Sequence, residues 1–194
     1  MALTEVAPGL RRWTAWHEEW KEDVSCVAVD SDDGLVVIDP LDPPRELGRP
    51  EHALVTVFFH ARSTKARHVW AHERIVRRLA SRGVEVDRPF TAGEQLPAGI
   101  QAIQTARPSE VAYWLPRQKA VVVGDVLLGA GAKPHATDEP LRLCPERWLE
   151  GGRHDDLRAS LAPLLELPVA RVLVSHGEPV LRGGDRALVA VLEH

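Results

Sequence analysis

The chain contains little of several features that would define a protein class. Its 194 residues include two cysteines, Cys26 and Cys144, which lie far apart and form no Cys-x-x-Cys motif. This count excludes a disulfide scaffold and predicts two reduced, structural thiols. Only 4 of its 24 basic residues are lysines, and no long block of one charge sign occurs, so we expect no nucleic-acid partner. No apolar run approaches the ~20 residues of a membrane-spanning helix.

The remaining composition is that of an ordinary globular protein, with 44% hydrophobic residues, 27% charged residues and a net charge of −4. Residues 1–12 lack the apolar core of a signal peptide. We therefore expect a soluble, cytoplasmic protein with no membrane partner. The length predicts a single domain over residues 1–191. The last three residues, 192–194, read Leu-Glu-His and resemble the remnant of a tag.

Apolar runs separated by turn residues predict a β-rich first part of the chain. Residues 24–29 and 35–38 flank a Ser-Asp-Asp-Gly turn and predict a hairpin. Residues 53–59 are nearly all apolar, which predicts a strand buried on both faces. Further strands are expected at 68–71, 100–104, 111–115, 120–123 and 171–175.

Helices are predicted over residues 73–81, 155–167 and 184–191. The second of them has leucines on one face, but Pro163 within it predicts a kink or a late start. Residues 129–140 are rich in Gly, Pro and small residues and predict a surface loop. Strands first, and then strands alternating with helices, fit a β-sandwich with helices outside it.

Three polar residues follow apolar strands: His60 after VTVFF, Asp125 after AVVVG and His176 after VLVS. Strand ends hold side chains in fixed positions next to exposed loops, where reactive groups are often found. Each residue alone is more often structural. Together, two imidazoles and one carboxylate form a suitable ligand set for one metal ion.

Four segments in order resemble the metallo-β-lactamase fold superfamily: VVIDP, VTVFFHARSTK, AYWLPRQKAVVVGDVLLG and VLVSHGEP. The resemblance covers residues 9–179 and implies an α/β fold. That fold is an αββα sandwich of two mixed β-sheets with helices on the outer faces. The resemblance also implies an active site at one edge of the sheets. Family members usually hold one or two metal ions there and hydrolyse esters, thioesters, amides or phosphodiesters.

The chain departs from the family's His-x-His-x-Asp-His metal motif. The matching stretch, residues 60–65, reads HARSTK, so His60 alone remains. The other positions of the motif hold Arg62, Thr64 and Lys65. Arginine keeps its proton at any usable pH and cannot act as a ligand. Thr64 replaces the aspartate that in the family handles the proton of the attacking water.

The remaining family positions are partly kept. Asp125 matches the carboxylate that bridges two metal ions, and His176 matches the last histidine. The loop that carries another histidine in the family has none here and holds Arg107 instead. Three of the seven usual ligands therefore remain.

Two functions of different class follow, and the sequence favours the first because two cations beside His60 should repel a metal ion. In the first, no metal cofactor is bound, and the former active-site cleft holds a small anionic ligand. The ligand-binding residues are then Arg62, Lys65, Arg107, Asp125, His60 and His176, and Asp125 pairs with Arg62 or Lys65. In the second, one zinc or other divalent ion is held by His60, Asp125 and His176 in a hydrolase of an ester, thioester or similar substrate.

Tryptophan and Asp39 complete the set of candidates. Trp13, Trp16 and Trp20 are spaced either for a core stripe on a short helix or hairpin, or for a flap over the pocket mouth. A self-association surface is a further alternative, which would make the protein a homodimer. Trp148 is a candidate for closing the other side of the pocket. Asp39, after a strand, is expected to orient the site loops through backbone hydrogen bonds.

Overall fold

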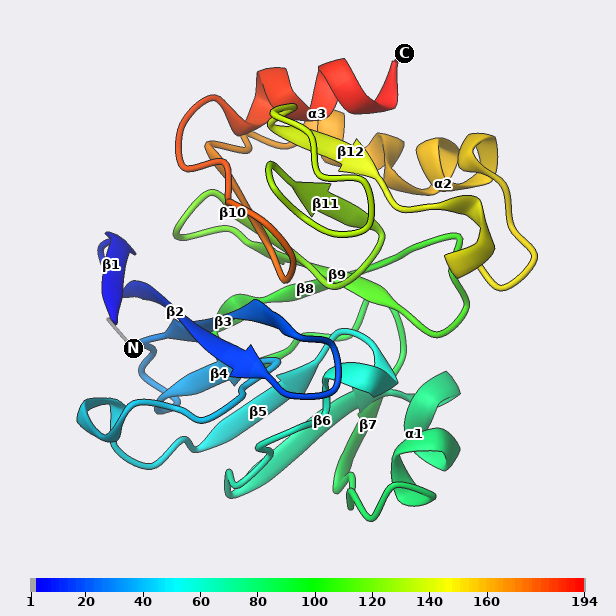
Figure 1. Cartoon of the computed structure of the whole chain (residues 1–194). Helices are drawn as coiled ribbons and strands as arrows, with labels where there is room; N and C mark the ends of the chain where they lie inside the picture. Colours follow the sequence, from blue (N-terminus) through cyan, green and yellow to red (C-terminus); the bar gives the residue numbers. More distant parts are fainter. Residues whose placement is uncertain (1–2, 194) are drawn as a thin grey trace.

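Two β-sheets form the centre of the molecule, and helices lie outside them (Figure 1). The computed structural model describes residues 3–193. The predicted α/β sandwich with two mixed sheets is therefore confirmed. None of the described helices is both long and apolar enough to cross a membrane.

The first sheet has seven strands that lie side by side in chain order. They are β1 (Thr4–Ala7), β2 (Leu10–His17), β3 (Glu22–Val29), β4 (Val36–Ile38), β5 (His52–Val55), β6 (His68–His72) and β7 (Arg88–Phe90). Pairing is antiparallel from β1 to β4 and parallel from β4 to β7. Helix α1 (Glu73–Ala80) packs beside β6 and β7.

The second sheet has the order β13-β10-β9-β8. Its strands are β8 (Gln101–Gln104), β9 (Val111–Leu115), β10 (Ala120–Val123) and β13 (Arg171–Val174), and β11 (Leu127–Gly129) pairs with β12 (Leu141–Leu143) as a separate hairpin. Helices α2 (His154–Leu161) and α3 (Gly184–Leu192) pack on this half of the molecule. The strands β10 and β13 are parallel neighbours, so the segments that follow them start at the same edge.

One hydrophobic core lies between the two sheets. It joins residues of the first sheet, such as Ile38 and Leu54, to residues of the second, such as Leu115 and Val122. Burial of each such side chain contributes about 1.5–3 kcal/mol. The hydroxyl of Tyr113 donates to the carbonyl oxygen of Val55 at 2.8 Å and ties the sheets together just below the site.

Most predicted strands and helices are confirmed, and the two exceptions have local causes. The expected strand 53–59 ends at Val55, and residues 58–60 form a 3₁₀ turn. There the backbone N–H of Thr56 donates to the side chain of Asp39 at 2.8 Å, so it is lost to the sheet. The expected helix 155–167 is α2 followed by a 3₁₀ segment that holds Pro163, which has no N–H to continue the helix.

Two of the three residues expected to be a tag remnant, 192 and 193, lie within the described part of the chain. Leu192 ends α3 and is buried against the core of the second sheet. His194 lies outside the described residues, as do Met1 and Ala2.

Candidate functional site

The three strand-end residues predicted from the sequence meet between the sheets. His60 ends the 3₁₀ turn that follows β5, whereas Asp125 and His176 follow β10 and β13. All three are buried, and their nearest ligand atoms lie within 4.8 Å of one another. Within residues 3–193 this is the one group of its kind.

Each histidine of the cluster faces a carboxylate through both ring nitrogens. The inner nitrogens, His60 Nε2 and His176 Nε2, lie 3.0 and 3.2 Å from the same oxygen, Asp125 Oδ1. The outer nitrogen of His60 lies 2.9 Å from Asp39, and that of His176 lies 3.1 Å from Glu22. His60 Nε2 and His176 Nδ1 are buried and make no hydrogen bond of good geometry, although each lies close to a carboxylate oxygen.

Asp39 accepts a backbone hydrogen bond from the site loop, as the sequence predicts. Its carboxylate accepts the backbone N–H of Thr56 and the Thr56 hydroxyl, and it also contacts His60. The contact with His60 was not predicted. The role of Glu22 was also missed, because an acidic residue at the start of a strand normally faces solvent.

The other oxygen of Asp125 pairs with Arg107. Arg107 Nη1 lies 2.8 Å from Asp125 Oδ2 and 3.2 Å from Glu110, and all three side chains are buried or nearly so. The expectation that Asp125 pairs with Arg62 or Lys65 is therefore wrong. The loop between β8 and β9 brings Arg107 to the end of β10.

The two cations after His60 lie elsewhere. The guanidinium of Arg62 lies over the ring of Trp20, 5.2 Å from its centroid, and its Nη atoms are buried without hydrogen-bond partners. Lys65 is exposed and lines a separate surface depression together with Asp42 and Ser63. Of the predicted cationic ligand-binding residues, only Arg107 lines the main cavity.

Glu110 is a buried residue of the site that sequence reasoning missed. Its Oε1 accepts the backbone N–H groups of Asp125 at 2.8 Å and Val126 at 3.1 Å. A Cβ atom at Gly124 would lie 2.9 Å from this oxygen and 2.6 Å from the hydroxyl of Thr56, so a side chain has no room there. No local signal separates this Pro-Ser-Glu stretch from a solvated loop.

The charges in the cluster shift one another's pKa values. Burial alone would lower the pKa of His176, but Asp125 and Glu22 outweigh it and raise the pKa to about 9. Burial opposes the charge of His60 too, yet Asp125 and Asp39 raise its pKa. Burial would raise the pKa of Asp125, but His60 and His176 hold it well below its usual range. The attraction between Asp125 and the two histidines is thus a cause of all three shifts.

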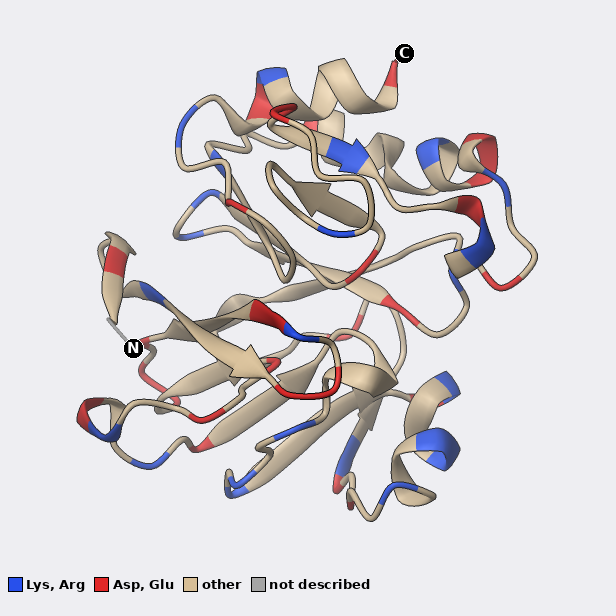
Figure 2. Ribbon diagram, viewed as in Figure 1, with Lys and Arg blue, Asp and Glu red and all other residues tan. Residues whose placement is uncertain are grey.

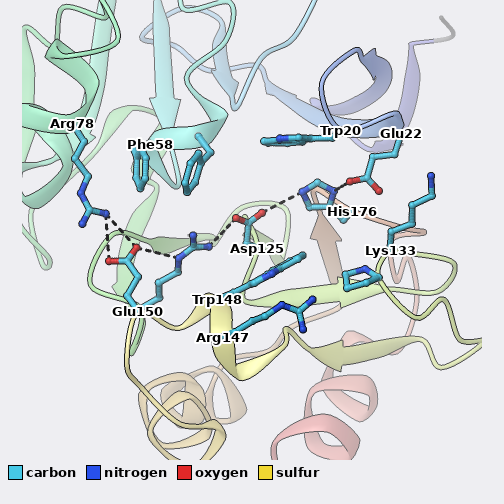
Figure 3. Close-up of a pocket in the computed structure, with 13 residues that line it drawn as sticks. Trp20, Glu22, Phe58, Arg78, Asp125, Lys133, Arg147, Trp148, Glu150 and His176 are labelled. Carbon is cyan, nitrogen blue, oxygen red and sulfur yellow. Dashed lines mark hydrogen bonds and ion pairs between the residues drawn. The ribbon is translucent and has the colours of Figure 1, made fainter.

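A cavity of about 1020 Å³ opens above Asp125 and His176 (Figure 3). Its lining is aromatic and charged: Trp20, Glu22, Phe58, Phe59, Arg78, Arg107, Asp125, Lys133, Pro134, Arg147, Trp148, Glu150 and His176. The ring of Trp20 covers the histidines, with its centroid 5.7 Å from that of His60 and 5.5 Å from that of His176. Trp148 lies on the other side of Asp125, as predicted.

Of the three N-terminal tryptophans, one belongs to the core and another lines the cavity, so each of the two interpretations holds for part of the set. They belong to the antiparallel pair β2–β3 and the turn between its strands, not to a helix. Trp13 is 1% exposed and belongs to the core. Trp16 is 49% exposed, and Trp20 lines the cavity. In the view of Figure 2, basic and acidic residues are both scattered over the two halves of the molecule.

Two further histidines, His72 and His154, make structural contacts. His72 accepts the backbone N–H of Arg74 at the start of α1. His154 Nε2 lies 2.7 Å from the carbonyl oxygen of Cys144, and both cysteines are buried.

Solved structures resemble the chain over nearly its whole length, although no family model and no curated protein matches its sequence. The DIM-1 metallo-β-lactamase has a TM-score of 0.71 at 14% identity and covers 100% of this chain and 94% of its own. A metallo-β-lactamase from Pontibacter korlensis has a TM-score of 0.69 at 15% identity and covers 100% and 99%. The mono-zinc form of FIM-1 from Pseudomonas aeruginosa has a TM-score of 0.67 at 12% identity and covers 99% and 94%. At such identities the likeness establishes a fold and no activity.

Proposed function

The chain has the metallo-β-lactamase fold, and on that premise we propose that it is a hydrolase with a single divalent ion, zinc or another, at His60, Asp125 and His176. Its substrate is a small anionic ester, thioester or similar compound. Fold alone does not decide an activity, so the proposal depends on the geometry of these residues.

The observation that supports the proposal is that each of the three residues has an outer partner, while its remaining ligand atom lies close to those of the other two. The outer partners of His60, His176 and Asp125 are Asp39, Glu22 and Arg107. The inner atoms, two Nε2 and one Oδ1, lie within 4.8 Å of one another. Metal-binding histidines are typically oriented by a carboxylate on the other ring nitrogen, which also makes them more basic ligands.

The residues fit one ion and do not fit two. Two imidazoles and a carboxylate with an open position suit zinc or a similar divalent ion. The other positions of the family motif hold Arg62, Thr64 and Lys65, and Lys65 lies outside the cavity. Neither guanidinium nor ammonium has a lone pair to offer.

A bound ion would polarise a carbonyl oxygen or lower the pKa of a bound water. Residues of the chain would compensate charge, exclude water and attract the substrate. Arg107 compensates the charge of Asp125, and Trp20 covers the histidines and excludes bulk water. Lys133 and Arg147 attract an anionic substrate to the cavity.

A metal-free site that binds a small anion is the second candidate. It is favoured by the position of Arg107, 2.8 Å from Asp125, because a guanidinium beside a ligand carboxylate repels a cation. The raised pKa values of His60 and His176 support it as well, since protons then replace the metal ion.

Hydrolysis by the metal-free and metal-supplemented protein separates the two candidates. Protein treated with a chelator is assayed with and without zinc, manganese or iron against phenyl esters, thioesters, amides and phosphodiesters. The proposal predicts metal-dependent turnover by the parent and by His68→Ala, whose site lies outside the cavity, and none by His60→Ala. A parent protein that hydrolyses nothing with any metal, yet binds small carboxylates, contradicts the hydrolase and supports the second candidate.

A further inference from the structure

A row of side chains with alternating charge lines the cavity (Figure 3). Along the row, each side chain lies within ion-pair distance of the next, in the order Arg78, Glu150, Arg107, Asp125, His176 and Glu22. Asp125 and His176 are two of the three candidate metal ligands, and Glu22 is the outer partner of His176. Glu150 lies toward the other end of the row, beyond Arg107.

Three side chains contact the carboxylate of Glu150. The hydroxyl of Ser109 donates to its Oε1. Arg78 Nη1 lies 3.3 Å from each of its oxygens. Arg107 Nε lies 3.5 Å from Oε1, which is an ion pair without an aligned hydrogen bond. Partial burial opposes the charge of Glu150, yet Ser109, Arg78 and Arg107 together lower its pKa, so the carboxylate is ionised at neutral pH.

Arg107 lies between this carboxylate and the candidate metal site. Its Nη1 lies 2.8 Å from Asp125 Oδ2, and its Nε faces Glu150. A guanidinium beside Asp125 repels a metal ion, because like charges repel. A carboxylate on the other side of the guanidinium offsets part of this repulsion. It also gives Nε a partner while Nη1 contacts Oδ2, and Oδ1 is the oxygen of Asp125 that faces the histidines.

From these contacts we propose that Glu150 is a positioning residue that sets the preference of the cavity for a cation over an anion. It acts through Arg107, whose charge it offsets and whose orientation it supports. The inference rests on the proposed function and deepens it, because it explains how an arginine and a metal ion can share Asp125. Without the charge of Glu150, a cation should bind more weakly and an anion more tightly.

The alternative is that Glu150 only anchors a loop. It ties the segment after the 3₁₀ turn Glu146–Trp148 to helix α1 through Arg78 and to the loop between β8 and β9 through Ser109. Loss of an anchor would loosen the site and weaken every ligand. Loss of a charge acts in opposite directions on a cation and an anion, so binding of both kinds of ion separates the two roles.

The test uses zinc and propionate as probes of the full chain. Glu150→Gln removes the charge and keeps the size of the side chain. Competition with a chromogenic chelator measures zinc affinity, and calorimetry measures propionate binding to zinc-free protein. We expect the variant to bind zinc about tenfold more weakly, within the range for outer partners of metal ligands. It should bind propionate about threefold more tightly, as expected for removal of one nearby, partly screened charge.

Two further variants assign the effect to charge. Glu146→Gln changes an exposed acid of the neighbouring turn, which accepts the backbone N–H of His154, and is the matched control that should change neither affinity. Arg78→Gln removes the cation that shares Glu150 with Arg107, so it should weaken propionate and not weaken zinc. A loop anchor would instead require Arg78→Gln to weaken zinc as Glu150→Gln does.

Unchanged affinities in Glu150→Gln, or weaker binding of both ions, would overturn the inference. Its failure differs from failure of the proposed function. Zinc binding without hydrolysis defeats only the hydrolase. A parent protein that binds no zinc defeats the proposed function, and propionate then decides the role of Glu150: tighter binding by Glu150→Gln supports it, and equal or weaker binding overturns it.

Discussion

Two histidine clusters of this chain look alike at first and differ in one respect. In the cavity, the rings of His60 and His176 lie 5.7 Å apart between centroids, and on the first sheet those of His52 and His68 lie 5.6 Å apart. Each pair has a carboxylate nearby, Asp125 in the cavity and Asp87 on the first sheet. The proximity of two histidines and an acid therefore does not by itself define a site.

The difference is where the ring nitrogens point. In the outer cluster, His52 accepts the indole N–H of Trp70 at 3.1 Å, and its other nitrogen lies 3.2 Å from the carbonyl oxygen of Asp33. Both nitrogens of His52 are thus used, and Asp87 contacts only His68. In the cavity one carboxylate oxygen faces both histidines. Convergence on a shared acceptor separates a candidate site from a structural cluster.

Removing an arginine from each histidine cluster should give the largest difference in stability between the cavity and the outer cluster. Arg107→Ala removes the buried cation that pairs with both Asp125 and Glu110 and should lower the free energy of unfolding by about 3–5 kcal/mol. Arg88→Ala removes a half-exposed ion pair with Asp87 and should cost less than about 1 kcal/mol. Denaturant unfolding measures both. Equal costs for the two variants would contradict the buried network described here.

Glu110→Gln tests the same network through pH, in protein kept free of metal. Burial, aided by the charge of Asp125, raises the pKa of Glu110 from 4.5 to about 7. The folded state thus binds this proton more tightly than the unfolded state, so the parent loses stability as the pH rises from about 4.5 to 7. Glutamine does not titrate, and the variant should gain about 2–3 kcal/mol relative to the parent over that range. A stability difference independent of pH would show that Glu110 is ionised throughout.

Glu22→Gln tests the orienting contact on the cavity side. It weakens the acceptor for the outer nitrogen of His176 and should lower metal affinity about 10–100-fold, as for other partners of metal-binding histidines. Glu51→Gln removes a carboxylate that pairs with Arg67 near the outer cluster and is the matched control. Competition with a chromogenic chelator measures both affinities. A Glu22→Gln protein that binds metal as tightly as Glu51→Gln would remove Glu22 from the site.

The smallest effect is expected in the outer cluster. Burial opposes ionisation of Asp87, but the hydrogen bonds from His68 and Val69 together outweigh it and lower its pKa. A carboxyl group whose pKa is lowered by folding stabilises the folded state at a pH above its pKa in the unfolded chain. This stabilisation is lost as the pH falls through its pKa in the folded state. Because Asp87 is largely exposed, Asp87→Asn should cost less than about 1 kcal/mol at pH 7 and nothing in strong acid. Melting curves at the two pH values check this, and a large loss at pH 7 would place Asp87 among the buried acids.

The residues of the site that sequence could identify are those that follow strands. His60, Asp125 and His176 each come directly after an apolar run, and strand neighbours then bring them together. Glu22 and Glu110 were missed because their burial depends on which loop packs over them, and no local pattern records that.

Because Asp125 was expected to be buried, the sequence predicted a cation beside it, but it did not show which residue supplies that cation. The sequence favoured Arg62 or Lys65 because they follow His60 directly, whereas the structure supplies Arg107 from the loop between the strands β8 and β9. Separation along the chain is a poor guide here, since the side chain of Arg62 turns to Trp20 instead. The early end of β5 had a similar cause, a tertiary hydrogen bond from Thr56 to Asp39.

The most direct test of the account is the number of metal ions that the cavity holds. Parent protein, His60→Ala and His52→Ala are dialysed against zinc and then against zinc-free buffer, and the bound ion is counted by native mass spectrometry. The account predicts about one retained ion per chain for the parent and for His52→Ala, and none for His60→Ala, which loses one of three ligands. A parent protein that retains no ion, or a His60→Ala protein that retains as much as the parent, would contradict it.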